Sequence, residues 1–83
     1  MELEINKNLM AENGENINLI YKVVYNNGYD IVVTAKNQNI SETVTAKSRA
    51  QNETEAVELI SLLANNFVTP VTVFDVISDY EKA

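Results

Sequence analysis

The sequence predicts an α+β fold in which an antiparallel three-stranded meander carries two C-terminal helices on one face. Two β-branched and aromatic runs flank the short segment Asn26-Asn27-Gly28, and a third alternating run follows them. Two helically periodic segments then complete the 83 residues. Consecutive strands followed by consecutive helices are typical of a sheet whose helices all pack on the same side.

The first hairpin is predicted to join residues 17–25 and 29–36 through a three-residue loop. A two-residue turn would set polar side chains opposite apolar ones, and a slip of one residue would turn the buried set toward solvent. We expect Gly28 to adopt the left-handed conformation that ends such a loop. The expected pairs are Tyr25 with Tyr29, Val23 with Ile31, Tyr21 with Val33, and Leu19 with Ala35. In this register Tyr21, Tyr25 and Tyr29 all point toward the helices.

The third strand is predicted over residues 40–47, after a four-residue polar loop. In that register Val44 lies beside Ile31. Glu42 then falls opposite Val33 on the inner face, where an unpaired carboxylate is costly. Either Glu42 lies at the margin of the sheet or a bulge shifts this strand.

Residues 1–16 are rich in asparagine and glutamate and precede a single α+β domain over residues 17–83. Leu3 and Ile5 alternate with glutamates, which suits a fourth strand at the edge of the sheet. A mobile N-terminal arm is the other interpretation, because terminal segments are often poorly ordered.

The two helices are predicted from their start signals and their apolar spacing. Asn52 followed by Glu55 is an asparagine-led capping box, and Pro70 suits the first turn of the second helix. The buried faces are expected to comprise Ala56, Leu59, Ile60, Leu63 and Phe67 in the first helix, and Val73, Phe74, Val76, Ile77 and Tyr80 in the second.

Composition argues against catalysis and cofactors. The chain contains neither cysteine nor histidine, so a disulfide, a thiolate metal site and a Ser–His nucleophile are excluded. Gly14 and Gly28 lie fourteen positions apart, so no glycine-rich phosphate loop exists. Asp75 and Asp79 lie one helical turn apart, but a hard cation needs more oxygen ligands, so a solvated helix face is expected there. We therefore expect no enzyme, no metal, no cofactor and no small-molecule substrate.

The charge and the hydropathy of the sequence limit the expected location of the protein and its expected partners. The net charge of −6 opposes attraction to a nucleic-acid backbone and favours solubility. The acidic start does not fit a secretory signal, and the apolar runs are too short for a membrane span. The expected location is the cytoplasm, with no membrane partner.

The C-terminal segment reads Val68-Thr69-Pro70-Val71-Thr72-Val73-Phe74-Asp75-Val76-Ile77-Ser78-Asp79-Tyr80, and an earlier strand reads Tyr29-Asp30-Ile31. These segments resemble an uncharacterised family, a domain of unknown function, of small Gram-positive bacterial proteins. Its members have a Tyr-x-Ile strand and an ending of the form Val-Ser-Pro-Ile-x-Leu-x-Asp-Val-Ile-Glu-Asp-Phe. The chain departs from the family at Asp30, where glycine is common, and at Ala46-Lys47-Ser48, which replaces Asp-Ile-Ser. The resemblance covers the last two-thirds of the chain, supports the α+β fold, and implies no activity or cofactor.

The expected register leaves one face of the sheet, the outer face, without helices. Ile20, Val24 and Val32 lie on it as an apolar patch. Four of the six basic residues accompany the patch, namely Lys22, Lys36, Lys47 and Arg49. Such a patch can mark a partner surface or a dimer contact. The other interpretation is that residues 1–16 fold back and cover it. The side chains that would do so are Leu3, Ile5 or Leu9.

A second apolar side chain, Leu62, is expected on the solvated side of the first helix, together with Glu55 and Glu58. It is either an ordinary exposed leucine or a contact point with an acidic rim. The sequence therefore predicts a small non-enzymatic protein-interaction module, either regulatory or self-associating through the outer face or a sheet edge. Its predicted partner-binding residues are Ile20, Lys22, Val24, Val32 and Leu62.

The alternative function is nucleic-acid binding on the basic outer face. Open sheets that read RNA stack bases on exposed aromatic side chains. The net negative charge and the inward direction expected for the tyrosines both argue against it.

Overall fold

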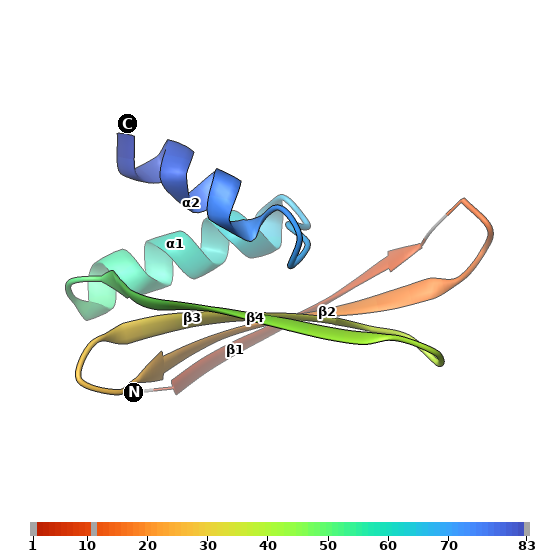
Figure 1. The fold of residues 1–83 in the computed structure, drawn as a ribbon, viewed down its shortest axis with the longest axis horizontal. Helices are drawn as coiled ribbons and strands as arrows, with labels where there is room; N and C mark the ends of the chain where they lie inside the picture. Colours follow the sequence, from red (N-terminus) through yellow and green to blue (C-terminus); the bar gives the residue numbers. More distant parts are fainter. Residues whose placement is uncertain (1, 11, 83) are drawn as a thin grey trace.

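A four-stranded antiparallel sheet carries two helices on one face, as the computed structural model in Figure 1 shows. The structure describes residues 2–10 and 12–82. The strands follow one another in the sheet in chain order. The elements are β1 Glu2–Met10, β2 Asn16–Tyr25, β3 Tyr29–Lys36, β4 Ser41–Ala50, α1 Glu53–Asn65 and α2 Val73–Lys82. The predicted α+β class is confirmed, and the N-terminal segment supplies the fourth strand at the edge of the sheet.

Strand β1 follows the strict alternation of its sequence. It pairs antiparallel with β2, with Leu3 opposite Val23 and Ile5 opposite Tyr21. Leu3, Ile5 and Leu9 pack against the core on the helix side, whereas Glu4, Asn6 and Asn8 face the other way. Lys7 shares the helix side, with its ammonium 5.8 Å from the centre of the Phe67 ring.

The register of the β2–β3 hairpin is confirmed, from Tyr25 opposite Tyr29 to Leu19 opposite Ala35. The prediction for its loop is wrong in one respect, because Asn27, at φ 58°, takes the left-handed conformation instead of Gly28. Asparagine tolerates that region better than most residues, so the loop does not need glycine there. Gly28 instead lies close to β4: a Cβ on it would lie 2.8 Å from Ser48 Oγ, so the serine hydroxyl would have to rotate away.

The register of β4 differs from the prediction by two residues. Val44 pairs with Val33 and Ala46 with Ile31. The loop spans residues 37–40, and the Asn37 side chain closes it by accepting hydrogen bonds of 2.8 Å from the backbone N–H groups of residues 39 and 40. A shift of two residues leaves each side chain on its expected face, so the inner set is unchanged.

A bulge interrupts β4 after Ala46. Ile31 pairs with Ala46, but Tyr29 already pairs with Ala50, so three residues of β4 lie opposite a single residue of β3. Ser48 lies in this bulge with φ 53°. Its backbone N–H donates a 2.8 Å hydrogen bond to the Asp30 carboxylate.

The core lies between the helices and the inner face of the sheet. Tyr21 is fully buried in it, and its hydroxyl donates a 2.8 Å hydrogen bond to the Val68 carbonyl. Helix α1 begins at the predicted cap, where the Asn52 side chain accepts from the Glu55 backbone N–H at 2.9 Å. The largest fully buried side chains are Tyr21, Leu19, Ile31, Leu59, Ile60, Leu63, Ile77, Val23, Val33 and Val73.

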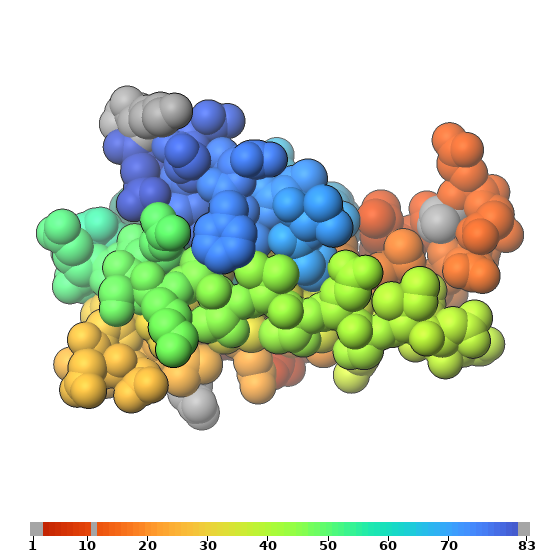
Figure 2. Space-filling view, in the orientation of Figure 1, coloured from red at the N-terminus to blue at the C-terminus, as the bar shows by residue number. Residues whose placement is uncertain are grey.

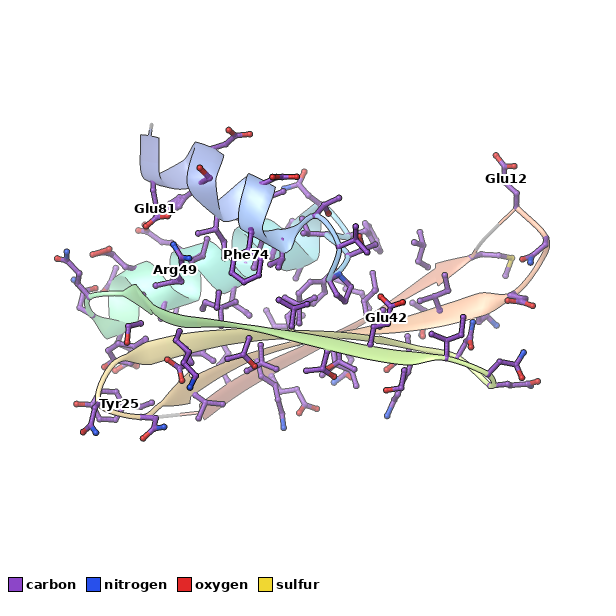
Figure 3. All side chains as sticks on the ribbon, in the orientation of Figure 1. Glu12, Tyr25, Glu42, Arg49, Phe74 and Glu81 are labelled. Carbon is purple, nitrogen blue, oxygen red and sulfur yellow. The ribbon has the colours of Figure 1, made fainter. Side chains whose placement is uncertain are left out.

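Three aromatic side chains predicted to be inward are exposed instead. Phe67 lies beyond the end of α1 with φ 51°, so the helical spacing that would bury it no longer applies. Phe74 is 45% exposed and faces Arg49 of β4. Helix α2 begins at Val73 and not near Pro70. Tyr25 is 56% exposed because Tyr29 occupies the position against the core, and the Tyr25 ring packs on that of Tyr29 at 5.0 Å between centroids. Figure 3 shows Tyr25 at the hairpin end of the sheet.

Candidate interaction site

The outer face of the sheet has no helix over it in Figure 1. Ile20 pairs with Thr34, and Val32 pairs with Lys22, so the predicted patch lies across the two central strands. The three apolar side chains Ile20, Val24 and Val32 are half-buried by their neighbours in the sheet, and Lys22 is exposed among them. The structure therefore brings four of the five predicted partner-binding residues together.

The N-terminal segment does not fold back over this patch. Leu3, Ile5 and Leu9, which were candidates to cover it, point to the helix side of β1. The alternate residues of β1 instead extend the outer face, with Glu4 opposite Lys22. These two side chains form a salt bridge at 3.7 Å.

The expected basic rim is only partly present. Arg49 faces α2 and not the outer face: its guanidinium lies 3.3 Å from Glu81 and 5.7 Å from the centre of the Phe74 ring. Figure 3 shows these three side chains together on the helix side. The bulge explains this placement, because it changes the alternation of side chains along the end of β4. With Lys22 paired to Glu4, the outer face is less cationic than the sequence predicts.

Leu62 lies apart from the other predicted partner residues. It is 37% exposed on α1, and that helix packs on the inner face of the sheet. Any contact through Leu62 would therefore use a different side of the molecule from the outer-face patch.

A further apolar surface, which the sequence analysis did not identify, lies where the helices stop. A ten-residue strand spans about 33 Å, whereas the thirteen residues of α1 span about 20 Å. The helices therefore leave one end of the inner face bare, next to the loops before β2 and β4. Figure 2 shows the blue helical layer stopping short of the orange and yellow-green segments at that end.

This bare end forms a groove of about 270 Å³, which we call the apolar groove. Val71 is 78% exposed and Ile40 is 55% exposed. Lys36 and Glu42 are the charged residues of its lining, and Figure 3 shows Glu42 on the helix side of β4, beyond the helices. The apolar lining is Ile17, Ala35, Ile40, Pro70 and Val71. The mismatch between strand and helix lengths was the sequence signal that could have revealed it.

A polar cleft of about 640 Å³ adjoins the groove at the same end of the sheet. Its carboxamides can each donate and accept hydrogen bonds. Asn18 already donates to Asn8 at 3.2 Å. The carboxamide residues that line the cleft are Asn8, Asn16, Asn18, Asn37, Gln38 and Asn39.

A third depression lies between the end of β4 and the two helices and includes Arg49, Tyr80 and Glu81. The Tyr80 hydroxyl donates to Glu58 at 3.3 Å. Burial, and then the negative charge of Glu58, raise the pKa of Tyr80 above its ordinary value. The tyrosine hydroxyl is thus held in its neutral form and is a hydrogen-bond donor, not a base.

Within residues 2–10 and 12–82, no group of three or more acidic side chains is arranged to hold a metal ion. None of the described helices is long and apolar enough to cross a membrane.

The comparisons with known proteins give a family without an assigned activity. A family model described as a family of unknown function, DUF6514, matches residues 1–83. No curated protein matches the chain, and neither does any solved structure. This supports the resemblance to an uncharacterised domain and extends it over the whole sequence. The chain belongs to the family of unknown function DUF6514.

Proposed function

We propose that this protein is a small non-enzymatic protein-interaction module that presents the outer face of its sheet to a protein partner. One observation carries the proposal: Ile20, Val24 and Val32 lie around Lys22 on a face of the sheet that neither the helices nor β1 covers. A sheet with helices on one side only must leave its second face to water or to a partner. Three β-branched side chains on that face favour a partner.

The surroundings of the patch resemble the anatomy of a protein interface. An apolar centre with a polar rim is typical of specific contacts between proteins. On the β1 side, Glu4 forms a salt bridge with Lys22, whose side chain lies between Ile20 and Val24 inside the patch. On the other side the hydroxyls of Thr34 and Thr43 share a hydrogen bond of 3.0 Å. These rim groups already have partners within the sheet, so a second protein can cover them without leaving a buried charge unpaired.

The non-enzymatic part of the proposal rests on the side chains available. Without histidine or cysteine, the chain lacks the usual general base and the usual thiol nucleophile. We propose the cytoplasm as the location, because the sequence contains no apolar run long enough for a membrane span.

Nucleic-acid binding receives less support. Lys22 is neutralised by Glu4, and Arg49 by Glu81, so two of the bases expected on a phosphate-binding face are already paired. Tyr25 is exposed, but its ring packs at the hairpin end against Tyr29, whose side chain lies on the core side of the sheet. Sheet readers of RNA need stacking side chains on the open face itself.

Site-specific photo-crosslinking in cells tests the proposal. A benzoylphenylalanine at Thr45, exposed on the outer face, should give a discrete protein adduct, and the same probe at Glu53 on α1 should not. The adduct should disappear in an Ile20→Lys/Val32→Lys background, because two ammonium groups in the patch would have to be desolvated on binding. An adduct that survives this double substitution, or that forms only from position 53, would refute the proposal.

A further inference from the structure

We propose that Asn13 is a site of spontaneous covalent modification, at which the side chain loses its amide nitrogen and becomes aspartate or isoaspartate. The reacting pair is Asn13 and Gly14, in the loop between β1 and β2. The same dipeptide recurs at Asn27-Gly28, and the structure directs the reaction to the first of the two. The reaction does not depend on a protein partner, so this inference goes beyond the proposed function.

The reaction needs only the chain and water. The main-chain nitrogen of Gly14 gives up its proton to solvent base and attacks Asn13 Cγ, so that a new C–N bond forms. The bond between Cγ and Nδ2 then breaks, and that nitrogen takes up a proton and leaves as ammonia. Water opens the resulting cyclic imide at either carbonyl carbon, which leaves aspartate or isoaspartate. Glycine favours the attack because it has no Cβ to crowd the attacking nitrogen.

A hydrogen bond prepares the Asn13 carboxamide for this attack. Its Oδ1 accepts from the main-chain N–H of Glu15 at 3.0 Å. This hydrogen bond closes a ring of atoms that contains both Asn13 Cγ and Gly14 N, so the side chain is kept close to the nitrogen that attacks it. When Cγ becomes tetrahedral, negative charge develops on Oδ1, and the same N–H is already in place to stabilise that charge.

The backbone around Gly14 has the space to bring the two reacting atoms together. Asn13 and Gly14 are both exposed. Within the described residues, no atom beyond the chain neighbours of Gly14 lies within 4 Å of the place that a Cβ would occupy. Figure 3 shows Glu12, the preceding residue, at the tip of this hairpin and away from the helices. The loop can therefore reach the attacking geometry by a local movement that leaves the core intact.

The second dipeptide is held more tightly. Gly28 is half-buried against β4, where a Cβ on it would lie 2.8 Å from Ser48 Oγ. The Gly28 carbonyl accepts a 2.8 Å hydrogen bond from the main-chain N–H of Asn26. Rotation of the peptide group between Asn27 and Gly28 disturbs these contacts, so the attacking geometry costs more free energy there than at Asn13.

The product changes the margin of the polar cleft, whose lining includes Gly14 and Glu15. Each event replaces a neutral carboxamide by a carboxylate next to Glu15. Isoaspartate also inserts an additional methylene into the main chain. A carboxylate accepts hydrogen bonds but cannot donate them, so the cleft gains negative charge and loses a donor at its margin.

Peptide mapping by mass spectrometry, during incubation of the protein at mildly alkaline pH, tests the site. Trypsin cleaves after Lys7, Lys22 and Lys36, so Asn13 and Asn27 lie on separate peptides. In the folded protein Asn13 should be converted at least about tenfold faster than Asn27, which corresponds to a barrier lower by about 1.4 kcal/mol. In concentrated urea the two rates should become similar, because only the fold distinguishes the two dipeptides. Equal rates in the folded protein, or a difference that persists in urea, would overturn the proposal.

Two substitutions at one position isolate the main-chain N–H of Glu15. Glu15→Pro removes this donor and should slow the conversion of Asn13 by at least about threefold, less than in an enclosed oxyanion site because water can replace the donor. Glu15→Ala removes only the carboxylate and keeps the N–H, so the rate should stay within about twofold of the wild type. Conversion of Asn27, followed in the same samples, should be unchanged in both variants. Equal slowing by alanine and by proline would contradict the role of the N–H group.

Discussion

The Asp30 carboxylate accepts a 2.8 Å hydrogen bond from the backbone N–H of Ser48, across the bulge in β4. Asp30 is only 8% exposed and is the buried charged residue of the described chain. Its hydrogen bond satisfies an N–H group that the bulge removes from the sheet ladder. The side chain of a central strand thus fixes the shape of the edge strand.

Asp30→Ala is expected to reduce the free energy of unfolding by about 1–3 kcal/mol, because the Ser48 N–H loses its acceptor in a part-buried position. Asp30→Asn keeps an acceptor oxygen at the same place and should cost less. Urea unfolding monitored by circular dichroism measures both. Equal losses for alanine and asparagine would show that the hydrogen bond is not the stabilising contact.

Gly28 and Ser48 are expected to be energetically coupled. Gly28→Ala should destabilise the fold by about 1 kcal/mol, because the new Cβ would lie 2.8 Å from Ser48 Oγ. Ser48→Gly should be neutral or stabilising, since φ 53° is strained for serine and easy for glycine. The double variant should recover most of the loss, and a double-mutant cycle from urea unfolding gives the coupling energy. Strict additivity of the two substitutions would contradict the contact.

Tyr21 makes the fold sensitive to high pH. Burial raises the pKa of its hydroxyl from 10.0 to about 12. The folded state therefore holds the proton more tightly than the unfolded state. This contribution to stability is fully present below pH 10 and is lost as the pH rises through about 12. The midpoint of urea unfolding should fall over that interval in the wild type.

Tyr21→Phe is the matched control for this pH dependence. It removes the hydroxyl that donates to the Val68 carbonyl and should cost about 1 kcal/mol at neutral pH. The fall in stability between pH 10 and about 12 should be smaller in the variant than in the wild type. An identical fall in both proteins would assign the effect to other groups.

The sequence predicted the β2–β3 register correctly because a one-residue slip there exchanges apolar and polar faces. It did not predict the β4 register. A slip of two residues leaves every side chain of β4 on the same face of the sheet, so the apolar pattern is the same in both registers. The deciding interaction was the Asn37 side chain, which closes the loop through the backbone N–H of Ile40. A hydrogen bond of this kind has no signature in hydrophobic periodicity.

The candidate site was predicted in part. The patch of Ile20, Val24 and Val32 follows directly from strand alternation and the hairpin register, so the sequence was sufficient. The position of Arg49 depends on the bulge, whose place the sequence did not determine. The apolar groove around Val71 depends on where α1 ends relative to the sheet, which alternation along a single strand does not reveal.

Solvent access to the outer face is the most direct test of the proposed interaction surface. A soluble gadolinium chelate can be added to methyl-labelled protein, and the relaxation of each methyl signal can be measured by nuclear magnetic resonance. The methyl groups of Ile20, Val24 and Val32 should relax strongly, whereas those of Leu19, Val23 and Val33, which are fully buried under the helices, should not. Equal protection of the two sets would mean that the outer face is covered within the chain itself, and the proposed partner surface would not exist.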